Sequence, residues 1–478
     1  MKKIFLFAVV FINISFCFAQ QQTASFEPSV KEKKDVFTVV NSKDNKVALF
    51  FSDKKSISAL LFDEGLKLSD TITTTYSNKE VDDIIGYSYT GQKYYVYWSG
   101  SEDTQIIAQC YDFDAKKSNS SPISIDIGKE KIIDKITIQN TFYIITALKH
   151  TSILNFYCFT DGKMNKKTVD CSNYRFIDSS SKKVSFWEMY NEFSSTIYYN
   201  GINNILDETP ASLVLSTHKK KAFVNGNSII FTFDTNEDFT QTLTINLSDF
   251  SATQKAFAQV PMPKREMGEI DSNSFFVNNN MIQIKSDWSV IYVTVKDMSG
   301  IELKKLAMYP GKEIEFKNSE IIQENGGINS TRILDKSSQL VRKISNLNPS
   351  VSSYFYNGRY NLVIGGVSNP QQDGVLIGAM VGGFTGAMIG AAISSNYSMN
   401  NLSSYNDRMV VYINCLFDQD FNHIKEEGKK LAFDKLRVFE EENKKILMNQ
   451  SIFKLNNKLY MGAFDKSTKL YTFYQFED

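Results

Sequence analysis

The side chains best suited to acid–base or metal chemistry in this sequence are its three histidines, His150, His218 and His423. A metal site needs several His, Cys or carboxylate ligands at short spacings, and none of the three has another His or Cys so placed. The chain has no HExxH, CxxC or GxSxG motif. Ser, His and Asp residues that are distant in the sequence could still form a catalytic triad in the folded protein, and the sequence leaves that alternative open. We therefore expect solvent-exposed turn histidines and predict no catalytic residue, no metal and no cofactor.

A short acidic run, residues 234–238 (DTNED), resembles the start of a calcium-binding loop, because oxygen ligands alternate along it. Such a loop needs glycine at its sixth position and glutamate at its twelfth, where this chain has Phe239 and Ile245. The run is therefore predicted to be a hairpin turn.

The charge balance limits the partners of the chain. Its 53 Lys and Arg residues equal its 53 Asp and Glu residues, so there is no basic excess of the kind that binds nucleic acid. Aromatic residues make up 13% of the 478 residues, with 36 Phe and 24 Tyr. This composition favours strands. We expect an all-β protein without a nucleic-acid partner.

A hairpin pattern recurs along the chain: a β-branched and aromatic run, a polar turn, and a second run that ends at a polar or acidic residue. The first three copies begin about 47 residues apart, which suits a four-stranded blade. We predict a β-propeller of about seven blades, within a range of six to eight; a sandwich or a long meander is the alternative. The last copy lacks a fourth strand, which the N-terminus could supply. The copies are 46–52 with 56–63, 93–98 with 105–112, 141–147 with 153–161, 228–234 with 242–249, 281–285 with 290–297, and 458–464 with 469–475.

Four cysteines follow the N-terminal segment: Cys110, Cys158, Cys171 and Cys415. Three of them lie near the ends of second strands in different copies of the repeat, and such positions are far apart in a propeller. A disulfide needs Cα atoms within about 7 Å. We expect Cys110, Cys158 and Cys415 to be buried free thiols, while a pair between Cys158 and Cys171 stays open.

The N-terminus has the pattern of a secretory signal peptide. Lys2 and Lys3 precede a mostly apolar stretch, 4–18, and Cys17 and Ala19 place small residues at the −3 and −1 positions of a cleavage site. The sequence therefore predicts a signal peptide, 1–19, and a mature β-propeller domain, 20–478. The mature protein is expected in the periplasm, in the outer membrane or at the cell surface.

One copy of the hairpin is interrupted. Residues 360–366 and 409–418 look like its two strands, and an insertion, 367–408, separates them. Within the insertion, residues 374–393 (GVLIGAMVGGFTGAMIGAAI) place glycine at every fourth position. On a helix these glycines form a smooth stripe that lets another helix approach closely. The stripe consists of Gly374, Gly378, Gly382, Gly383, Gly386 and Gly390.

This stretch resembles the glycine-zipper segments of bacterial outer-membrane and surface-antigen lipoproteins. The resemblance implies a helical segment or hairpin that contacts membrane or like copies. A single full span is disfavoured, because both flanks belong to one hairpin and must end on the same side of a membrane. A short hairpin in one leaflet, a helix against the propeller or a partner, and assembly of copies stay open. So do an apolar lid without membrane contact and a strand.

The favoured prediction is a non-enzymatic, exported bacterial β-propeller that acts as a binding or scaffold module at the cell envelope. Its glycine-zipper arm would contact membrane or partner copies. The alternative is a glycan-active hydrolase or lyase that uses carboxylates at the mouth of the propeller channel. Propellers host both kinds of function. A charged stretch near the C-terminus, 434–446, is predicted to be a short solvated helix between the last two blades.

Overall fold

The computed structural model describes residues 21–28, 35–52, 56–75, 83–100, 104–193, 201–263, 269–326, 328–369, 394–405 and 408–478. The predicted signal peptide, 1–19, lies outside these residues. So does the predicted stripe of Gly374, Gly378, Gly382, Gly383, Gly386 and Gly390.

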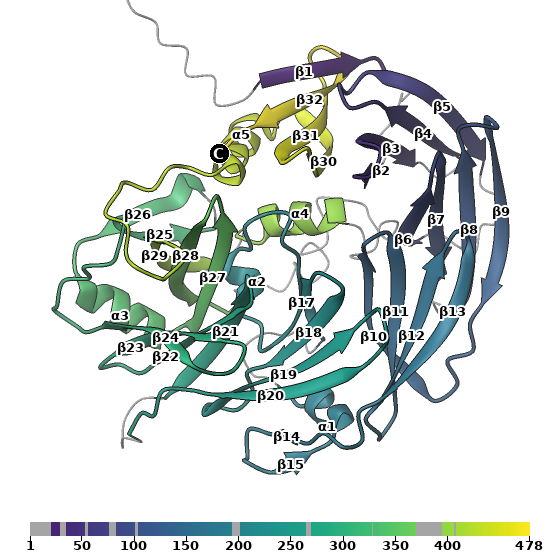
Figure 1. Cartoon of the computed structure of the whole chain (residues 1–478). Helices are drawn as coiled ribbons and strands as arrows, with labels where there is room; N and C mark the ends of the chain where they lie inside the picture. Colours follow the sequence, from purple (N-terminus) through teal and green to yellow (C-terminus); the bar gives the residue numbers. More distant parts are fainter. Residues whose placement is uncertain are drawn as a thin grey trace, which may run out of the picture.

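The described residues are mostly β, which confirms the all-β expectation. Seven sheets of four or five strands, and one two-stranded sheet, are formed in this part of the chain. Figure 1 shows the larger sheets arranged in sequence order around a common centre. The first three contain β2 (Asp35–Asn41), β3 (Lys46–Ser52), β4 (Ser56–Phe62) and β5 (Leu68–Thr75); β6 (Asp83–Thr90), β7 (Lys93–Ser99), β8 (Gln105–Asp112) and β9 (Lys117–Ser124); and β10 (Glu130–Ile138), β11 (Thr141–Leu148), β12 (Ile153–Thr160) and β13 (Lys163–Asp170).

The middle of the chain adds the two-stranded sheet, two short helices and two larger sheets. The fourth large sheet carries one extra strand, β16, which pairs with β17 in parallel. The elements are β14 (Phe176–Ile177), β15 (Lys183–Val184) and α1 (Phe186–Asn191); β16 (Asn203–Ile205), α2 (Leu213–Ser216), β17 (Lys220–Asn225), β18 (Ser228–Phe233), β19 (Phe239–Asn246) and β20 (Ala252–Ala258); and β21 (Asp271–Val277), β22 (Asn280–Ser286), β23 (Ile291–Asp297) and β24 (Glu302–Met308).

The sixth large sheet departs from chain order, because its strands follow the order β26-β25-β29-β28-β27. The seventh combines both ends of the described chain. The remaining elements are β25 (Ile321–Asn325), η1 (Ile328–Ser330), β26 (Thr331–Leu334), α3 (Ser337–Ser345), β27 (Asn348–Tyr356), β28 (Arg359–Val367), α4 (Ser394–Ser403) and β29 (Met409–Phe417); and α5 (Ala432–Asn443), β30 (Leu447–Leu455), β31 (Lys458–Asp465), β32 (Leu470–Phe476) and β1 (Gln21–Phe26).

The second strand of a sheet is apolar along most of its length, because it is covered on both faces by neighbouring sheets. In β3 every residue after Lys46 is buried. The fourth strand of a sheet is polar; β13 reads KMNKKTVD and buries only Val169. Between adjacent sheets, large rings meet, as where Phe50 packs edge-on against Tyr111 at 5.3 Å. This packing of sheet against sheet makes up most of the core.

The N-terminal strand completes the last sheet. β1 pairs antiparallel with β32, from Gln21 opposite Gln475 to Phe26 opposite Tyr471. The ring of Phe26 also lies 5.3 Å from that of Phe62 in the first sheet. The expectation that N-terminal residues supply the fourth strand of the last copy is confirmed.

The interrupted hairpin pairs as predicted, with Tyr360 opposite Phe417 and Val367 opposite Val410. The described end of its long connection is α4. None of the described helices is both long and apolar enough to cross a membrane.

The charged C-terminal stretch forms α5, but the prediction of a solvated connector is wrong. Phe433, Leu436 and Phe439 are buried on one side of α5 and share a hydrophobic cluster with Leu447 and Met461 of the last sheet.

Candidate functional site

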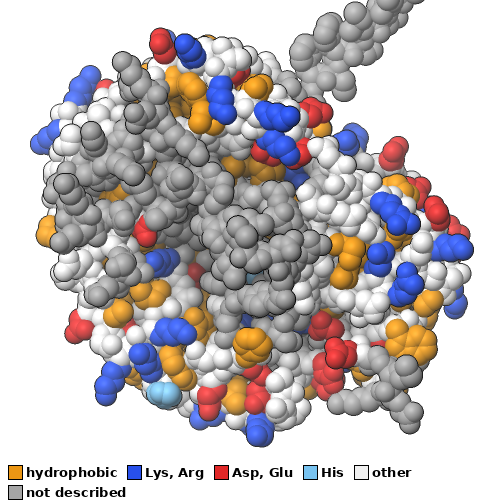
Figure 2. Space-filling model, turned by 180° about the vertical axis from the view of Figure 1, so that it is seen from behind, with side chains coloured by type: hydrophobic (Ala, Val, Ile, Leu, Met, Phe, Trp, Pro, Cys, Tyr) orange, Lys and Arg blue, Asp and Glu red, His pale blue; other side chains and the backbone are white. Residues whose placement is uncertain are grey.

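On the face shown in Figure 2, positive and negative side chains are interspersed. The most unusual charges of the described residues lie in the interior. Lys219, Lys220 and Lys221 follow one another at the start of β17 and are 7%, 2% and 0% exposed. Lysine is almost never fully buried unless its ammonium group is paired, so each partner matters.

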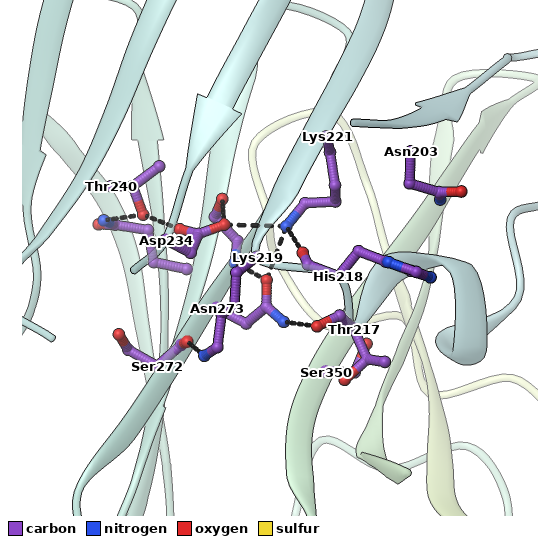
Figure 3. Close-up of polar contacts among 12 residues, drawn as sticks. Asn203, Thr217, His218, Lys219, Lys221, Asp234, Thr240, Ser272, Asn273 and Ser350 are labelled. Atoms are coloured by element: carbon purple, nitrogen blue, oxygen red, sulfur yellow. Dashed lines mark hydrogen bonds and ion pairs between the residues drawn. The ribbon is translucent and has the colours of Figure 1, made fainter. Parts of the chain in front are cut away.

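Lys221 forms a fully buried ion pair with Asp234, at 2.8 Å between Nζ and Oδ2. Its ammonium also donates to the Asn273 side chain at 2.7 Å and to the His218 carbonyl at 2.6 Å. Asp234 in turn accepts hydrogen bonds from Thr240 at 2.7 Å. Figure 3 shows these side chains converging between β17, β18 and β21. The pair is therefore fully hydrogen-bonded inside the protein, which is the condition under which a buried charge persists.

The two neighbouring lysines are held differently. Lys219 pairs with Asp271 at 2.6 Å and also donates to the Ser272 carbonyl. Lys220 donates to two carbonyl oxygens, those of Tyr190 at 2.6 Å and Glu192 at 2.5 Å. Burial lowers the pKa of Lys220 to about 8, although the charge of Glu192 opposes the change. Lys219 and Lys221 connect β17 to β21 of the next sheet, while Lys220 connects β17 to the C-terminal end of α1.

The histidines differ from expectation. His150 is exposed at a turn, as predicted, with its ring 5.6 Å from that of Trp187. His423 is half-buried, with Nε2 3.1 Å from the Asn318 side-chain oxygen. His218 is also partly buried, and burial together with the positive charges of Lys221 and Arg408 lowers its pKa to about 3. The prediction of exposure is therefore wrong for His218 and His423, because Arg408 and Asn318, which lie beside them, come from distant parts of the sequence.

The four cysteines are free thiols. Cys110, Cys171 and Cys415 are buried and Cys158 is partly buried. Burial raises the pKa of the Cys158 thiol to about 11 and that of Cys171 to about 12. Thiols of this kind are unreactive.

Residues 234–238 join β18 to β19, so the predicted turn is confirmed, but its first aspartate is the buried partner of Lys221. Across the ranges that the structure describes, no group of three His, Cys, Asp or Glu side chains could hold a metal ion.

A second buried carboxyl lies on the innermost strand of the third sheet. Asp134 in β10 is 8% exposed. Its Oδ1 accepts hydrogen bonds from the Asn204 side chain at 2.7 Å and from the Lys135 amide at 2.8 Å. Its Oδ2 and the Asn204 Oδ1 are both buried without a hydrogen-bond partner among the described residues. Burial raises the pKa of Asp134 to about 6, although the bond from Asn204 opposes the rise.

Asp134 was not singled out from the sequence. Its only signal is that it interrupts the apolar run of β10, and acidic residues interrupt many such runs at the surface. Asp134 is distinguished by its contact with Asn204 in β16, a strand of a different sheet. No local sequence pattern reveals that contact. A buried carboxyl with a raised pKa and an unpartnered oxygen can hold and release a proton near neutral pH.

No protein-family model and no curated protein matches the chain. Solved structures are similar in part. One is a variant of the Synechocystis apocarotenoid oxygenase, at 8% identity and a TM-score of 0.28, covering 57% of this chain and 61% of that one. Another comes from a study of two prolyl endopeptidases, at 8% identity and a TM-score of 0.32, covering 92% of this chain and 50% of that one. This chain thus matches less than two thirds of either length, and likeness at this level transfers no substrate or reaction.

The favoured prediction of a non-enzymatic binding or scaffold module is corrected. The solved structures that resemble this chain in part are enzymes.

Proposed function

We propose that the chain is an exported β-propeller enzyme of seven blades, closed by β1, that cleaves glycans as a hydrolase or a lyase. The seven sheets in sequence order and the pairing of β1 with β32 support the propeller. Because β1 comes from the start of the described chain and forms the fourth strand of the last sheet, it joins the two ends of the chain in one sheet, which suits a closed ring.

The observation that carries the enzymatic proposal is the carboxyl group of Asp134. Cleavage of a glycosidic bond needs an acid that donates a proton to the leaving oxygen, and enzymes keep that acid protonated by burying it. Asp134 has the required raised pKa, one oxygen fixed by Asn204, and a second oxygen without a partner in the described part of the chain.

In this proposal, Asp134 protonates the glycosidic oxygen from Oδ2 while Asn204 holds Oδ1. A second carboxylate would act as base. Asp207 and Glu208 come shortly after Asn204 in the sequence, and Asp207 is exposed. Their negative charges act on the same buried side chain, Tyr397, whose pKa is raised by burial and by these charges. Asp134 is buried and Asp207 is exposed. Carboxyl groups in such different surroundings suit the roles of acid and base.

The test is the release of reducing ends from a panel of bacterial and plant polysaccharides by the mature protein and by Asp134→Asn. The variant is expected to lose at least about 100-fold in rate, the usual contribution of a general acid. The rate of the parent should fall as pH rises through about 6, where Asp134 loses its proton. An active Asp134→Asn variant would contradict the assignment, and inactivity of the parent on the whole panel would contradict the glycan class.

The same variant gives a check that does not depend on substrate. The pKa of Asp134 is raised from 3.8 to about 6 in the fold, so the folded state loses stability as pH rises from 4 to 6, by roughly 3 kcal/mol. Asp134→Asn should therefore be more stable than the parent at pH 7.5 and lose that advantage at pH 4. The exposed control Asp207→Asn should show no such difference. Urea unfolding at both pH values measures it.

We also propose export, with the glycine-rich stretch as a membrane or self-association segment. Membrane fractionation and sedimentation of the mature protein, with and without residues 367–408, would test this. We expect the full chain to pellet with membranes or to sediment as an oligomer, and the deleted form to do neither. Two equally soluble, monomeric forms would rule out both contacts.

A further inference from the structure

Helix α4 lies on the inner side of the sheets, between β30 and β17 (Figure 1). Its apolar residues Met399 and Leu402 pack with Leu447, Ile452 and Met461 of the last sheet. Its opposite side meets the segment that joins β16 to α2. A single helix thus bridges sheets that lie on opposite sides of the centre.

Asn401 makes the polar part of this bridge. It is 0% exposed, its Oδ1 accepts a hydrogen bond from the Ser212 amide at 2.8 Å, and its amide nitrogen donates to the Pro210 carbonyl at 2.6 Å and to Thr209 at 3.2 Å. Just beyond the helix, the Ser404 hydroxyl lies 2.7 Å from that of Ser212. The residues that Asn401 and Ser404 contact in this way all lie within 209–212.

The bound segment leads directly to the candidate acid. Residues 206–212 follow β16, and β16 carries Asn204, whose side chain donates to Asp134. Tyr397, one turn before Asn401, is buried beside the same segment, where the charges of Glu208 and Asp207 act on it. Residues 206–212 therefore connect the contact with Asn401 to the strand that carries Asn204.

We propose that α4 is a latch: Asn401 pins residues 209–212, which holds Asn204 against Asp134 and keeps the unpartnered oxygen of that carboxyl shielded. Release of the latch frees the segment and admits substrate. The inference rests on the proposed function for its consequence, but the latch itself can be measured without activity. Asn401 is in this sense a positioning residue.

The polar character of the contact supports a latch over a permanent brace. A brace gains most from apolar burial, as on the Leu402 side of α4. On the other side, the contacts are hydrogen bonds, each of which contributes only about 1 kcal/mol net because water replaces it on release. A segment held in this way opens at modest cost, as mobile elements of enzymes do.

The first experiment compares amide hydrogen exchange of residues 203–212 in Asn401→Ala and Asn400→Ala. Asn400 is exposed on the same helix, which makes it the matched control. Asn401→Ala removes the hydrogen bonds to Ser212, Pro210 and Thr209. A loss of about 1.4 kcal/mol corresponds to a tenfold change, so exchange should be at least about tenfold faster. The control should match the parent. Equal exchange in both variants would overturn the latch whether or not the protein is a glycan-cleaving enzyme.

The second experiment closes the latch covalently. The side-chain oxygens of Ser212 and Ser404 are close enough for the double variant Ser212→Cys/Ser404→Cys to form a disulfide after a small shift. Oxidation should lower the rate of glycan cleavage at least about tenfold, and reduction should restore it, while each single variant stays indifferent to oxidant. Full activity in the oxidised form, with the crosslink confirmed by mass, would overturn the latch. Inactivity of the reduced form and the parent alike would count against the proposed function alone, leaving the exchange result to decide the latch.

Discussion

Replacing Asp234 with alanine is expected to lower the free energy of unfolding by about 3–5 kcal/mol. The substitution leaves the ammonium group of Lys221 in a site that is 0% exposed, without its counter-ion. An unpaired charge in such a site is far more costly than the loss of one contact. The hydroxyl groups of Thr240 and Ser274 lose their acceptor in the same step. Urea unfolding of Asp234→Ala and the parent measures the difference.

Two further variants make this prediction specific. Removing both charges, as in Lys221→Met with Asp234→Leu, should recover most of the lost stability, because replacing a buried pair by apolar side chains is often neutral. Glu441→Gln breaks the pair between Glu441 and Lys444, which lies at the surface; an exposed pair contributes at most about 1 kcal/mol. If Asp234→Ala were as mild as Glu441→Gln, the buried pair would not hold the sheets together.

The same aspartate shows where sequence reasoning succeeds and where it stops. The turn at 234–238 follows from local chemistry, because a polar run between two apolar strands must leave the sheet. The burial of Asp234 does not follow from it, because Lys221 and Ser274 reach it from other strands. Three lysines in a row suggest an exposed loop, and only their distant partners make the interior tolerable.

The sequence predicted the positions of the strands better than the order of the strands within each sheet. Each copy of the repeat forms a hairpin because its β-branched and aromatic runs and the polar turn between them are local features of the sequence. The order β26-β25-β29-β28-β27 could not be foreseen, since β25 precedes β27 in the chain yet pairs with β29. The parallel strand β16 could not be predicted from the sequence either, because a strand of three residues is too short to show a pattern.

Helix α5 illustrates a third case. Its charged sequence correctly predicted a helix, but the spacing of Phe433, Leu436 and Phe439 places these residues on one face, and that face is buried. Charge content describes the outer side of such a helix, while the three- and four-residue spacing describes the side that packs. The spacing was the better guide here.

Removal of β1, residues 21–26, is expected to destabilise the protein by at least about 2 kcal/mol, somewhat less than the roughly 3–5 kcal/mol for truncating a fully buried Phe, because Phe26 is only half-buried. The ring of Phe26 packs against Phe62 in the first sheet and Tyr471 in the last, at 5.3 and 5.5 Å between ring centroids. Its loss removes contacts on both sides of the junction between these sheets. It also uncovers the edge of β32, which is then free to pair with another chain. We therefore expect a lower melting temperature and a concentration-dependent increase in light scattering.

The matched control removes only Gln21 and Gln22, which are exposed and contribute no apolar contact; it should unfold like the parent. The predicted signal cleavage after Ala19 would leave β1 whole, so the proposed export and the proposed closure of the propeller are compatible. A synthetic peptide of residues 21–28 should restore the melting temperature of the deleted form, because the edge of β32 is a template for a single antiparallel strand. If the deleted form is as stable and as monomeric as the parent, closure of the ring by β1 is wrong, and the sheets must be held together by their mutual packing alone.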